Sequence, residues 1–265
     1  MSTVTIAAHR GGAGVRPENT QAAFDHAVGL GCSFLELDVH VTRDGVPVVI
    51  HDATVDRTTD GSGAVAGLSA AETAELDAGY RFSEDGRSFP FRGKGIRIPT
   101  LEEVFARYPK SWISVDLKAS GTHLPAAVAE LIRRFEREQR TVVGSFSCRA
   151  AAAFRKLSPE AHAIACPAEV RRMVAAAAVR LAAAVPRKAD YLMVPEVWGR
   201  ARIITPAFLR AAASRGKKVF VWTVNDPDAA LRLARAGVDG IVTDYPARMA
   251  SVLRSEERRV GKECA

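Results

Sequence analysis

Apolar stretches alternate along most of the chain with stretches of mixed polarity, and this alternation predicts the elements of the fold. Short runs rich in Val, Ile and Phe are typical of buried strands, whereas apolar residues spaced by three and four indicate helices. The predicted strand segments are 4–8, 34–50, 112–118, 141–146, 161–166, 191–194, 218–224 and 240–243. The helices predicted to follow them are 19–30, 101–108, 125–138, 149–157, 169–184, 206–215, 226–236 and 246–253.

Local signals refine these boundaries. Asn19 is expected to cap the first helix, and Thr100 with Glu103 forms the pattern of a capping box. The second strand segment is interrupted by a turn at 42–45, after which residues 46–50 are expected to continue in extended form up to His51.

Strands that alternate with helices of this length predict a parallel sheet, and eight such units predict a closed (β/α)8 TIM barrel. An open doubly wound sheet is the alternative, but the glycine-rich phosphate loop typical of that fold does not occur in the sequence. Residues 52–98 break the rhythm and predict a small inserted subdomain after the second strand. The barrel domain is therefore expected to span 1–254, and the polar tail 255–265 is expected to be disordered or artefactual.

Composition agrees with one globular domain of 265 residues, with 48% hydrophobic and 25% charged residues. No apolar run approaches the roughly 20 residues that span a bilayer, and the first residues lack the pattern of a signal peptide. Stable membrane insertion is therefore not expected. The four cysteines show no metal-binding spacing, which favours free thiols and a cytoplasmic location; they are Cys32, Cys148, Cys166 and Cys264.

The net charge of +7 and the pI near 9.5 favour anionic partners, although a bias toward arginine accounts for much of the charge. Nucleic acid is not expected, because no basic helix or RNA-binding aromatic motif occurs. A small phosphorylated substrate fits equally well. The sequence gives no indication of the oligomeric state.

Two acids mark the second strand segment as chemically unusual. Glu36 and Asp38 are two residues apart on an apolar strand, so their side chains point to the same face. Their mutual repulsion would be relieved by a hard divalent cation such as Mg²⁺ or Ca²⁺. The alternative is structural, in which Asp38 bonds a neighbouring loop and Glu36 pairs with an arginine.

In a (β/α)8 barrel, active sites form at the carboxyl ends of the strands. Two histidines, three acids, one arginine and one lysine are expected to meet at this rim, which indicates a catalytic site. They are His9, Arg10, Glu36, Asp38, His51, Asp116 and Lys118. The seventh strand also carries Trp222 and Asn225, and the eighth ends in Thr243-Asp244.

A set of motifs in these segments resembles the glycerophosphodiester phosphodiesterases, in order and over residues 4–254. The motifs are His9-Arg10-Gly11, Pro17-Glu18-Asn19-Thr20, Glu36-Leu37-Asp38-Val39, Thr42-Arg43-Asp44-Gly45, His51-Asp52, Thr58-Thr59-Asp60-Gly61, Pro99-Thr100-Leu101-Glu102-Glu103, Trp222-Thr223-Val224-Asn225 and Thr243-Asp244-Tyr245-Pro246. The resemblance implies a TIM barrel with a small insertion after the second strand. It also implies hydrolysis of glycerophosphodiesters to sn-glycerol 3-phosphate and an alcohol with the help of Mg²⁺ or Ca²⁺.

The resemblance also implies roles for single residues. His9 and His51 match the family's paired general acid and base, a task that suits a side chain with a pKa near neutrality. Arg10 matches a phosphate-binding arginine, and Glu36 and Asp38 match two metal ligands.

One position departs from the family pattern. The third metal ligand is usually a glutamate two residues before a lysine, and here Asp116 precedes Lys118. Asp-x-Lys also resembles related phospholipases of the sphingomyelinase D type. Lys118 is expected to reach the phosphate and Trp222 to bind the substrate, while His40 is interpreted as a rim residue.

Two other functions remain open. A phospholipase D that acts on lysophospholipid or sphingolipid headgroups would need an apolar entrance, which Phe82, Phe89 and Phe91 of the insertion could supply. The third possibility is a barrel that binds glycerophosphodiesters without cleaving them.

Overall fold

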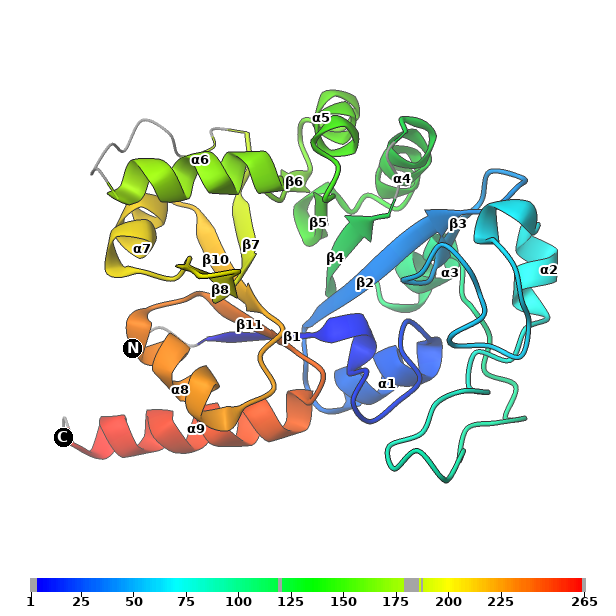
Figure 1. Cartoon of the computed structure of the whole chain (residues 1–265), viewed down its shortest axis with the longest axis horizontal. Helices are drawn as coiled ribbons and strands as arrows, with labels where there is room; N and C mark the ends of the chain where they lie inside the picture. Colours follow the sequence, from blue (N-terminus) through cyan, green and yellow to red (C-terminus); the bar gives the residue numbers. More distant parts are fainter. Residues whose placement is uncertain (1–3, 119–120, 179–185, 187, 264–265) are drawn as a thin grey trace.

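The computed structural model describes residues 4–118, 121–178, 186 and 188–263. Eight parallel strands form one sheet in the order β6-β5-β4-β2-β1-β11-β10-β7, and a parallel bridge between Ile164 and Tyr191 joins its two edges. The strands are β1 (Thr5–Ala8), β2 (Phe34–Val41), β4 (Trp112–Leu117), β5 (Thr141–Gly144), β6 (His162–Ala163), β7 (Tyr191–Pro195), β10 (Lys218–Trp222) and β11 (Gly240–Thr243). This closed sheet, which is surrounded by helices in Figure 1, confirms the predicted (β/α)8 barrel.

One helix follows each barrel strand and covers its outer face. These helices are α1 (Gln21–Gly29), α3 (Leu101–Arg107), α4 (His123–Arg134), α5 (Cys148–Leu157), α6 (Pro167–Ala178), α7 (Pro206–Ala213), α8 (Pro227–Ala236) and α9 (Pro246–Glu263). Single 3₁₀ turns add η1 (His9–Gly11), η2 (Val65–Gly67) and η3 (Glu138–Arg140). Leu35 and Leu37 of β2 are fully buried against the helices with Phe24 of α1. Each such side chain contributes about 1.5–3 kcal/mol by leaving water.

Aromatic side chains fill the barrel interior near the amino ends of the strands. The ring of Phe34 lies 6.1 Å from that of Trp112 and 5.1 Å from that of Phe220, and Tyr191 packs 5.6 Å from Phe220. Because strand side chains on one face recur every two residues, the next inward positions of β2 after Phe34 carry the two acids identified above. The polar centre of the barrel therefore rests on an apolar floor.

A hairpin carries His51 into this centre. The turn predicted at 42–45 is confirmed, and β3 (Pro47–Val49) runs back antiparallel to β2. The amide of Ile50 donates to the carbonyl oxygen of Asp38 at 3.0 Å, so the residues that follow β3 lie beside Asp38. The hairpin thereby brings the His51-Asp52 motif next to the motif that contains Glu36 and Asp38.

The insertion forms a small lobe at one side of the barrel (cyan, at the right of Figure 1). Its own apolar core is built on β3 and contains Val48, Ile50, Val55, Val65 and Ile98. It includes the short helix α2 (Ala70–Ala74), which begins with a capping box. The capping box predicted at Thr100 and Glu103 is also present.

Several predicted helix ends are wrong, among them that of α4, which ends at Arg134 rather than at 138. Thr20 rather than Asn19 caps α1, because Asn19 has a positive φ of 58° and its side chain turns toward Asp38. Helix α9 continues to Glu263, beyond the predicted end at 253, so most of the polar tail is helical rather than disordered. Its first turn beyond that point is tied to α8 by an ion pair of 2.8 Å between Arg235 and Glu256. The predicted helix segment 179–184 lies outside the described residues.

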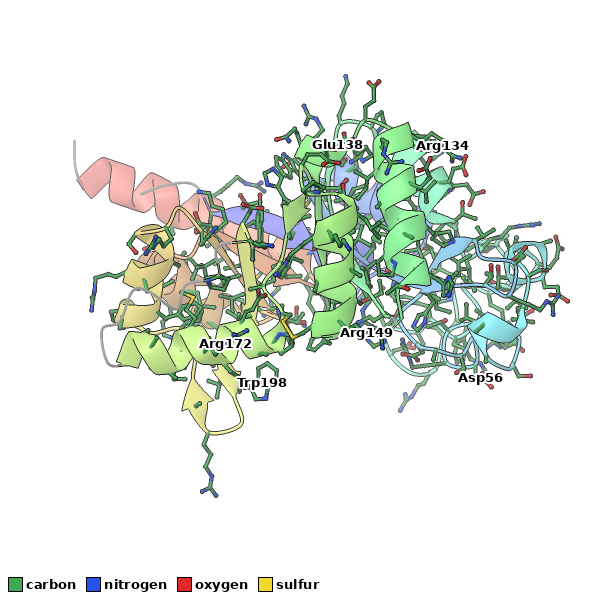
Figure 2. All side chains as sticks on the ribbon, turned by 90° about the horizontal axis from the view of Figure 1, so that it is seen from above. Asp56, Arg134, Glu138, Arg149, Arg172 and Trp198 are labelled. Carbon is green, nitrogen blue, oxygen red and sulfur yellow. A yellow bond between two sulfur atoms is a disulfide. The ribbon has the colours of Figure 1, made fainter. Side chains whose placement is uncertain are left out.

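A short hairpin between β7 and α7 was not predicted. Its strands β8 (Val197–Trp198) and β9 (Ala201–Arg202) have two residues each, too few to produce a periodic pattern. Figure 2 shows this hairpin projecting away from the barrel, with Trp198 on it.

The prediction of four free thiols is also wrong. Cys148 and Cys166 form a disulfide, with their Cα atoms 5.3 Å apart, whereas Cys32 is buried and free. Neighbouring strands β5 and β6 bring these two cysteines together, which no sequence spacing reveals. Cys264 lies outside the described residues. No helix in the described part of the chain is long and apolar enough to cross a membrane.

Candidate active site

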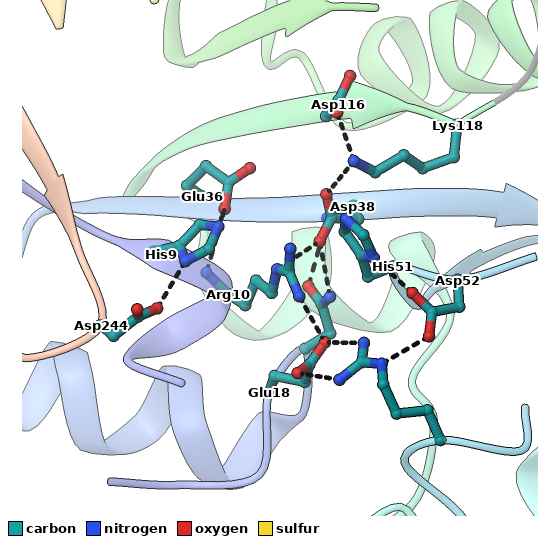
Figure 3. A network of polar contacts seen from close by, with 12 residues as sticks. His9, Arg10, Glu18, Glu36, Asp38, His51, Asp52, Asp116, Lys118 and Asp244 are labelled. Atoms are coloured by element: carbon teal, nitrogen blue, oxygen red, sulfur yellow. Dashed lines mark hydrogen bonds and ion pairs between the residues drawn. The ribbon is translucent and has the colours of Figure 1, made fainter. Parts of the chain in front are cut away.

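A cavity of about 210 Å³ opens at the carboxyl ends of the barrel strands. It is lined by every residue that the sequence assigned to the site: His9, Arg10, Glu36, Asp38, His51, Asp116, Lys118 and Trp222. Residues from β1, β2, β4 and β10, distant in sequence, thus share one concave surface. Figure 3 shows the polar side of this surface.

Both histidines are held in the same way. The Nδ1 atom of His9 lies 2.6 Å from Asp244 Oδ1, and the Nδ1 atom of His51 lies 2.6 Å from Asp52 Oδ1 (Figure 3). A carboxylate only accepts hydrogen bonds, so each Nδ1 donates, and the Nε2 atom of each ring takes no part in this bond. Asn225 donates to the other oxygen of Asp244 at 2.6 Å and fixes that carboxylate.

The surroundings of His9 favour its protonated form. Burial lowers the pKa of its imidazole, but the hydrogen bond to Asp244 and the negative charge of Glu36 outweigh that effect, and the pKa is raised above 6.5. Burial raises the pKa of the Asp244 carboxyl, but the contacts with His9, Asn225 and Arg10 together outweigh burial, and this pKa is lowered.

Two acids from neighbouring strands share one cation. Asp38 and Asp116 are register partners on β2 and β4, and Lys118 Nζ lies 2.9 Å from Asp38 Oδ1 and 2.7 Å from Asp116 Oδ2. Burial raises the pKa of the Asp116 carboxyl. At Asp38, burial acts in the same direction, but Lys118, Arg10 and Asn19 outweigh it and lower the pKa. Asp38 is therefore the firmly ionised member of the pair.

Glu36 is the least compensated acid in the cavity. It is 8% exposed, accepts the backbone N–H of Arg10 at 3.1 Å, and has His9 Nε2 at 3.9 Å. Burial and the negative charge of Asp38 raise the pKa of its carboxyl to about 7. A buried carboxylate without a close cation is unfavourable, and a positive ion beside it would relieve that cost.

The three carboxylates fit a hard divalent cation in kind, because Mg²⁺ and Ca²⁺ prefer oxygen ligands. The under-compensated Glu36 supports this fit. In the present arrangement the ammonium of Lys118 lies between Asp38 and Asp116. No three His, Cys, Asp or Glu side chains of the described residues converge as an ion would require.

A tight turn aims Arg10 into the cavity. Arg10 has a positive φ of 51°, and Gly11 follows with a φ of 83°. A Cβ on Gly11 would lie 2.7 Å from the Cβ of Ala23, so α1 packs too closely for any side chain there. Arg10 Nε lies 3.1 Å from Asp38 Oδ2 without pointing at it, and this buried N–H has no hydrogen-bond partner among the residues described. A phosphoryl oxygen is a suitable acceptor for it.

The other side of the cavity is apolar. Phe146 is 58% exposed, and its ring lies 5.9 Å from that of Trp222. Ile164, Val170, Met193, Val194 and Trp198 extend this wall. Phe82 and Phe91 of the insertion instead pack edge to face at 5.3 Å. Neither they nor Phe89 lines the cavity, so the apolar entrance lies elsewhere than predicted.

Several polar residues of the site were missed as site residues, although each lies in or beside a quoted motif. They are Glu18, Asn19, Asp52, Arg57 and Asp244. His40 does not line the cavity, and its Nε2 donates to the carbonyl oxygen of His51 at 3.0 Å. The missed residues hold the predicted ones in place, a task that leaves no separate signature in one sequence.

Fold and cavity together define an enzyme of the (β/α)8-barrel class whose polar rim suits acid–base hydrolysis of a phosphate ester. The chain belongs to the glycerophosphoryl diester phosphodiesterase family, whose model matches residues 9–248. Enzymes of this family generally depend on a divalent metal.

Individual relatives agree with this membership. The chain is 34% identical over 259 residues to a glycerophosphodiester phosphodiesterase of Caldanaerobacter subterraneus, with 96% of this chain and 99% of that protein covered. It is 29% identical to lysophospholipase D GDPD1 of Mus musculus, with 93% and 85% covered. Among solved structures, an Oleispira antarctica phosphodiesterase in complex with the product sn-glycerol-3-phosphate has a TM-score of 0.76 and 28% identity, with 94% of this chain and 96% of that chain covered.

Proposed function

We propose that this chain hydrolyses glycerophosphodiesters to sn-glycerol 3-phosphate and an alcohol in the cavity described above. The observation that carries the proposal is the placement of two imidazoles, each oriented by a carboxylate, around Arg10 and Lys118 in one cavity. Membership of a family of hydrolases argues against a barrel that only binds the diester.

The side chains divide the reaction between them. Arg10 and Lys118 hold the phosphate and stabilise the negative charge that develops on its oxygens. One imidazole removes a proton from the attacking hydroxyl, and the other gives a proton to the departing alkoxide. The raised pKa of His9 favours it as the proton donor, which leaves His51 as the acceptor.

We assign the metal to the three carboxylates of Glu36, Asp38 and Asp116. A bound Mg²⁺ or Ca²⁺ would add positive charge beside the phosphate and polarise its oxygens. Asp116 is one methylene shorter than the family's usual glutamate. It is the register partner of Asp38 on the neighbouring strand, which supports its inclusion among the ligands.

The experiment is coupled detection of sn-glycerol 3-phosphate released from glycerophosphocholine, glycerophosphoethanolamine and glycerophosphoglycerol. The protein is first treated with a chelator and then supplied with Mg²⁺ or Ca²⁺. We expect release that stops with chelation and returns with one of the two ions. The absence of release from all three substrates with either ion would refute the proposal.

Hydrolysis of lysophospholipids is a second candidate function, and the apolar wall of the cavity favours it. Phe146, Trp222 and the neighbouring apolar residues could receive an acyl chain next to the phosphate site. Comparison of lysophosphatidylcholine with glycerophosphocholine tests this: a higher kcat/KM for the lysophospholipid would make it the preferred substrate class.

The domain limits and the location also remain proposals. Residues 1–254, including the inserted 52–98, are proposed as one barrel domain. The predicted cytoplasmic location relied on free thiols, and the Cys148–Cys166 disulfide removes that support for two of the four cysteines. To test the location, the protein is purified from each cell fraction and its free thiols are counted.

A further inference from the structure

We propose that Arg57 of the insertion is a positioning residue. It holds His51 and the phosphate-binding Arg10 of the active site in a fixed relative geometry. This inference rests on the proposed function. It assigns to the insertion a task in catalysis, namely to close a chain of ion pairs around the polar rim.

The guanidinium of Arg57 binds two carboxylates at once. Its Nη1 and Nη2 atoms donate to the two oxygens of Glu18 at 2.7 and 2.8 Å, and its Nε atom donates to Asp52 Oδ2 at 2.6 Å. A planar fork with several fixed N–H directions makes such a paired contact, whereas a lysine cannot reproduce it.

Each carboxylate bound by Arg57 also accepts a hydrogen bond from a side chain of the active site. Asp52 Oδ1 lies 2.6 Å from His51 Nδ1, and Glu18 Oε1 accepts from Arg10 Nη1 at 2.9 Å. Arg57 itself does not line the cavity. It therefore acts on the substrate only through the orientation of His51 and Arg10.

The positive charge of Arg57 also affects the ionisation of both carboxylates. Burial raises the pKa of the Glu18 carboxyl, but Arg57 and Arg10 outweigh it and lower that pKa. The hydrogen bond from Arg57, ahead of the bond with His51, lowers the pKa of Asp52 to about 2. Both carboxylates thus stay ionised, so Asp52 remains an acceptor for His51 and Glu18 remains an acceptor for Arg10.

The two carboxylates bound by Arg57 are expected to affect different kinetic parameters. Loss of Glu18 frees Arg10 and should weaken substrate binding, whereas loss of Asp52 frees His51 and should slow the proton transfer. Small misplacements of reacting groups can cost about 100-fold in rate. Loss of Arg57 should combine both effects.

The test measures kcat and KM for glycerophosphocholine in Arg57→Ala, Arg57→Lys, Glu18→Gln and Asp52→Asn, together with thermal unfolding. We expect Glu18→Gln chiefly to raise KM and Asp52→Asn chiefly to lower kcat, each by about 10-fold, and Arg57→Ala to do both. Arg57→Lys keeps the charge and should recover only part of the loss. If Arg57→Ala does not fold, Arg57→Lys and the two carboxylate variants still carry the test.

Arg43→Ala is the matched control. Arg43 also joins the barrel to the insertion, by an ion pair of 3.0 Å with Glu72, but it does not line the cavity. We expect kcat and KM of this variant within twofold of the wild type. The proposal is overturned if Arg57→Ala matches Arg43→Ala in both parameters, or if Glu18→Gln and Asp52→Asn change the same parameter. Failure of the proposed function would look different, because the wild type itself would then release no sn-glycerol 3-phosphate.

Discussion

The two sides of the cavity are built by different means. On the polar side, β1, β2 and β4 supply charged residues whose positions are fixed by ion pairs, so that nearly every functional group has a polar partner. On the apolar side, the loops after β5, β6 and β7 supply side chains such as Phe146 and Trp198, which are partly exposed. The polar side therefore suits chemistry common to many diesters, whereas the apolar side suits discrimination among them.

Removal of either imidazole should produce the largest effect on the polar side. We expect His9→Ala and His51→Ala each to lower kcat by about 10²–10⁴-fold, because general acid–base catalysis contributes that much. Release of sn-glycerol 3-phosphate measures the loss, and calorimetric metal titration should show that the ion still binds. His123→Ala, an exposed position at the start of α4, serves as the control. Full turnover in either active-site variant would contradict the assignment.

Removal of the disulfide should weaken the apolar side without stopping the chemistry. Cys148 follows Phe146 closely, and Cys166 lies between Ala165 and Pro167, so the bond joins two loops of the apolar wall. We expect the double variant Cys148→Ser/Cys166→Ser to lose about 3 kcal/mol in free energy of unfolding, the usual size for a loop of this length. Urea unfolding measures it, and dithiothreitol should lower the stability of the wild type but not of the variant. An equal stability of variant and wild type would refute the contribution.

The pH dependence of stability should reveal the uncompensated acid of the polar side. The pKa of Glu36 is raised from 4.5 to about 7, so its favourable contribution is complete below pH 4.5 and is lost as the pH rises through 7. We expect metal-free Glu36→Gln to gain about 1–3 kcal/mol relative to the wild type between pH 5 and pH 7.5. Urea unfolding in chelator at both pH values measures this difference. Parallel pH profiles would show that Glu36 is already compensated.

The smallest effect should come from shortening the apolar wall. We expect Phe146→Ala and Trp222→Ala to raise KM for lysophosphatidylcholine by about 5–10-fold while changing KM for glycerophosphocholine by less than about twofold, because partial loss of apolar contact costs about 1 kcal/mol. Parallel assays of the two substrates measure this selectivity. An equal rise for both would place the wall beside the headgroup common to them.

The same contrast explains what the sequence could predict. Periodicity places Glu36 and Asp38 on one face of β2, the two histidines directly follow predicted strand segments, and the family resemblance adds the roles of all four residues. The holding partners are different: Asp244 reaches His9 over 235 residues and Arg57 reaches Glu18 over 39, and no local pattern in the sequence joins these positions.

The apolar wall was placed wrongly for a physical reason. Phe82, Phe89 and Phe91 are clustered in sequence and suggested an entrance, but Phe82 and Phe91 pack on each other within the insertion. The actual wall is assembled from single residues of several loops and from a hairpin with two-residue strands. Such an assembly leaves no local pattern, and neither did the disulfide beside it.

A crystal structure of the protein soaked with sn-glycerol 3-phosphate and a divalent cation would test whether the two histidines and the three acids form one catalytic site. We expect the phosphate to contact Arg10 and Lys118 between the Nε2 atoms of His9 and His51, and the cation to bind Glu36, Asp38 and Asp116. A phosphate bound outside this cavity, or a cation held by other residues, would contradict it.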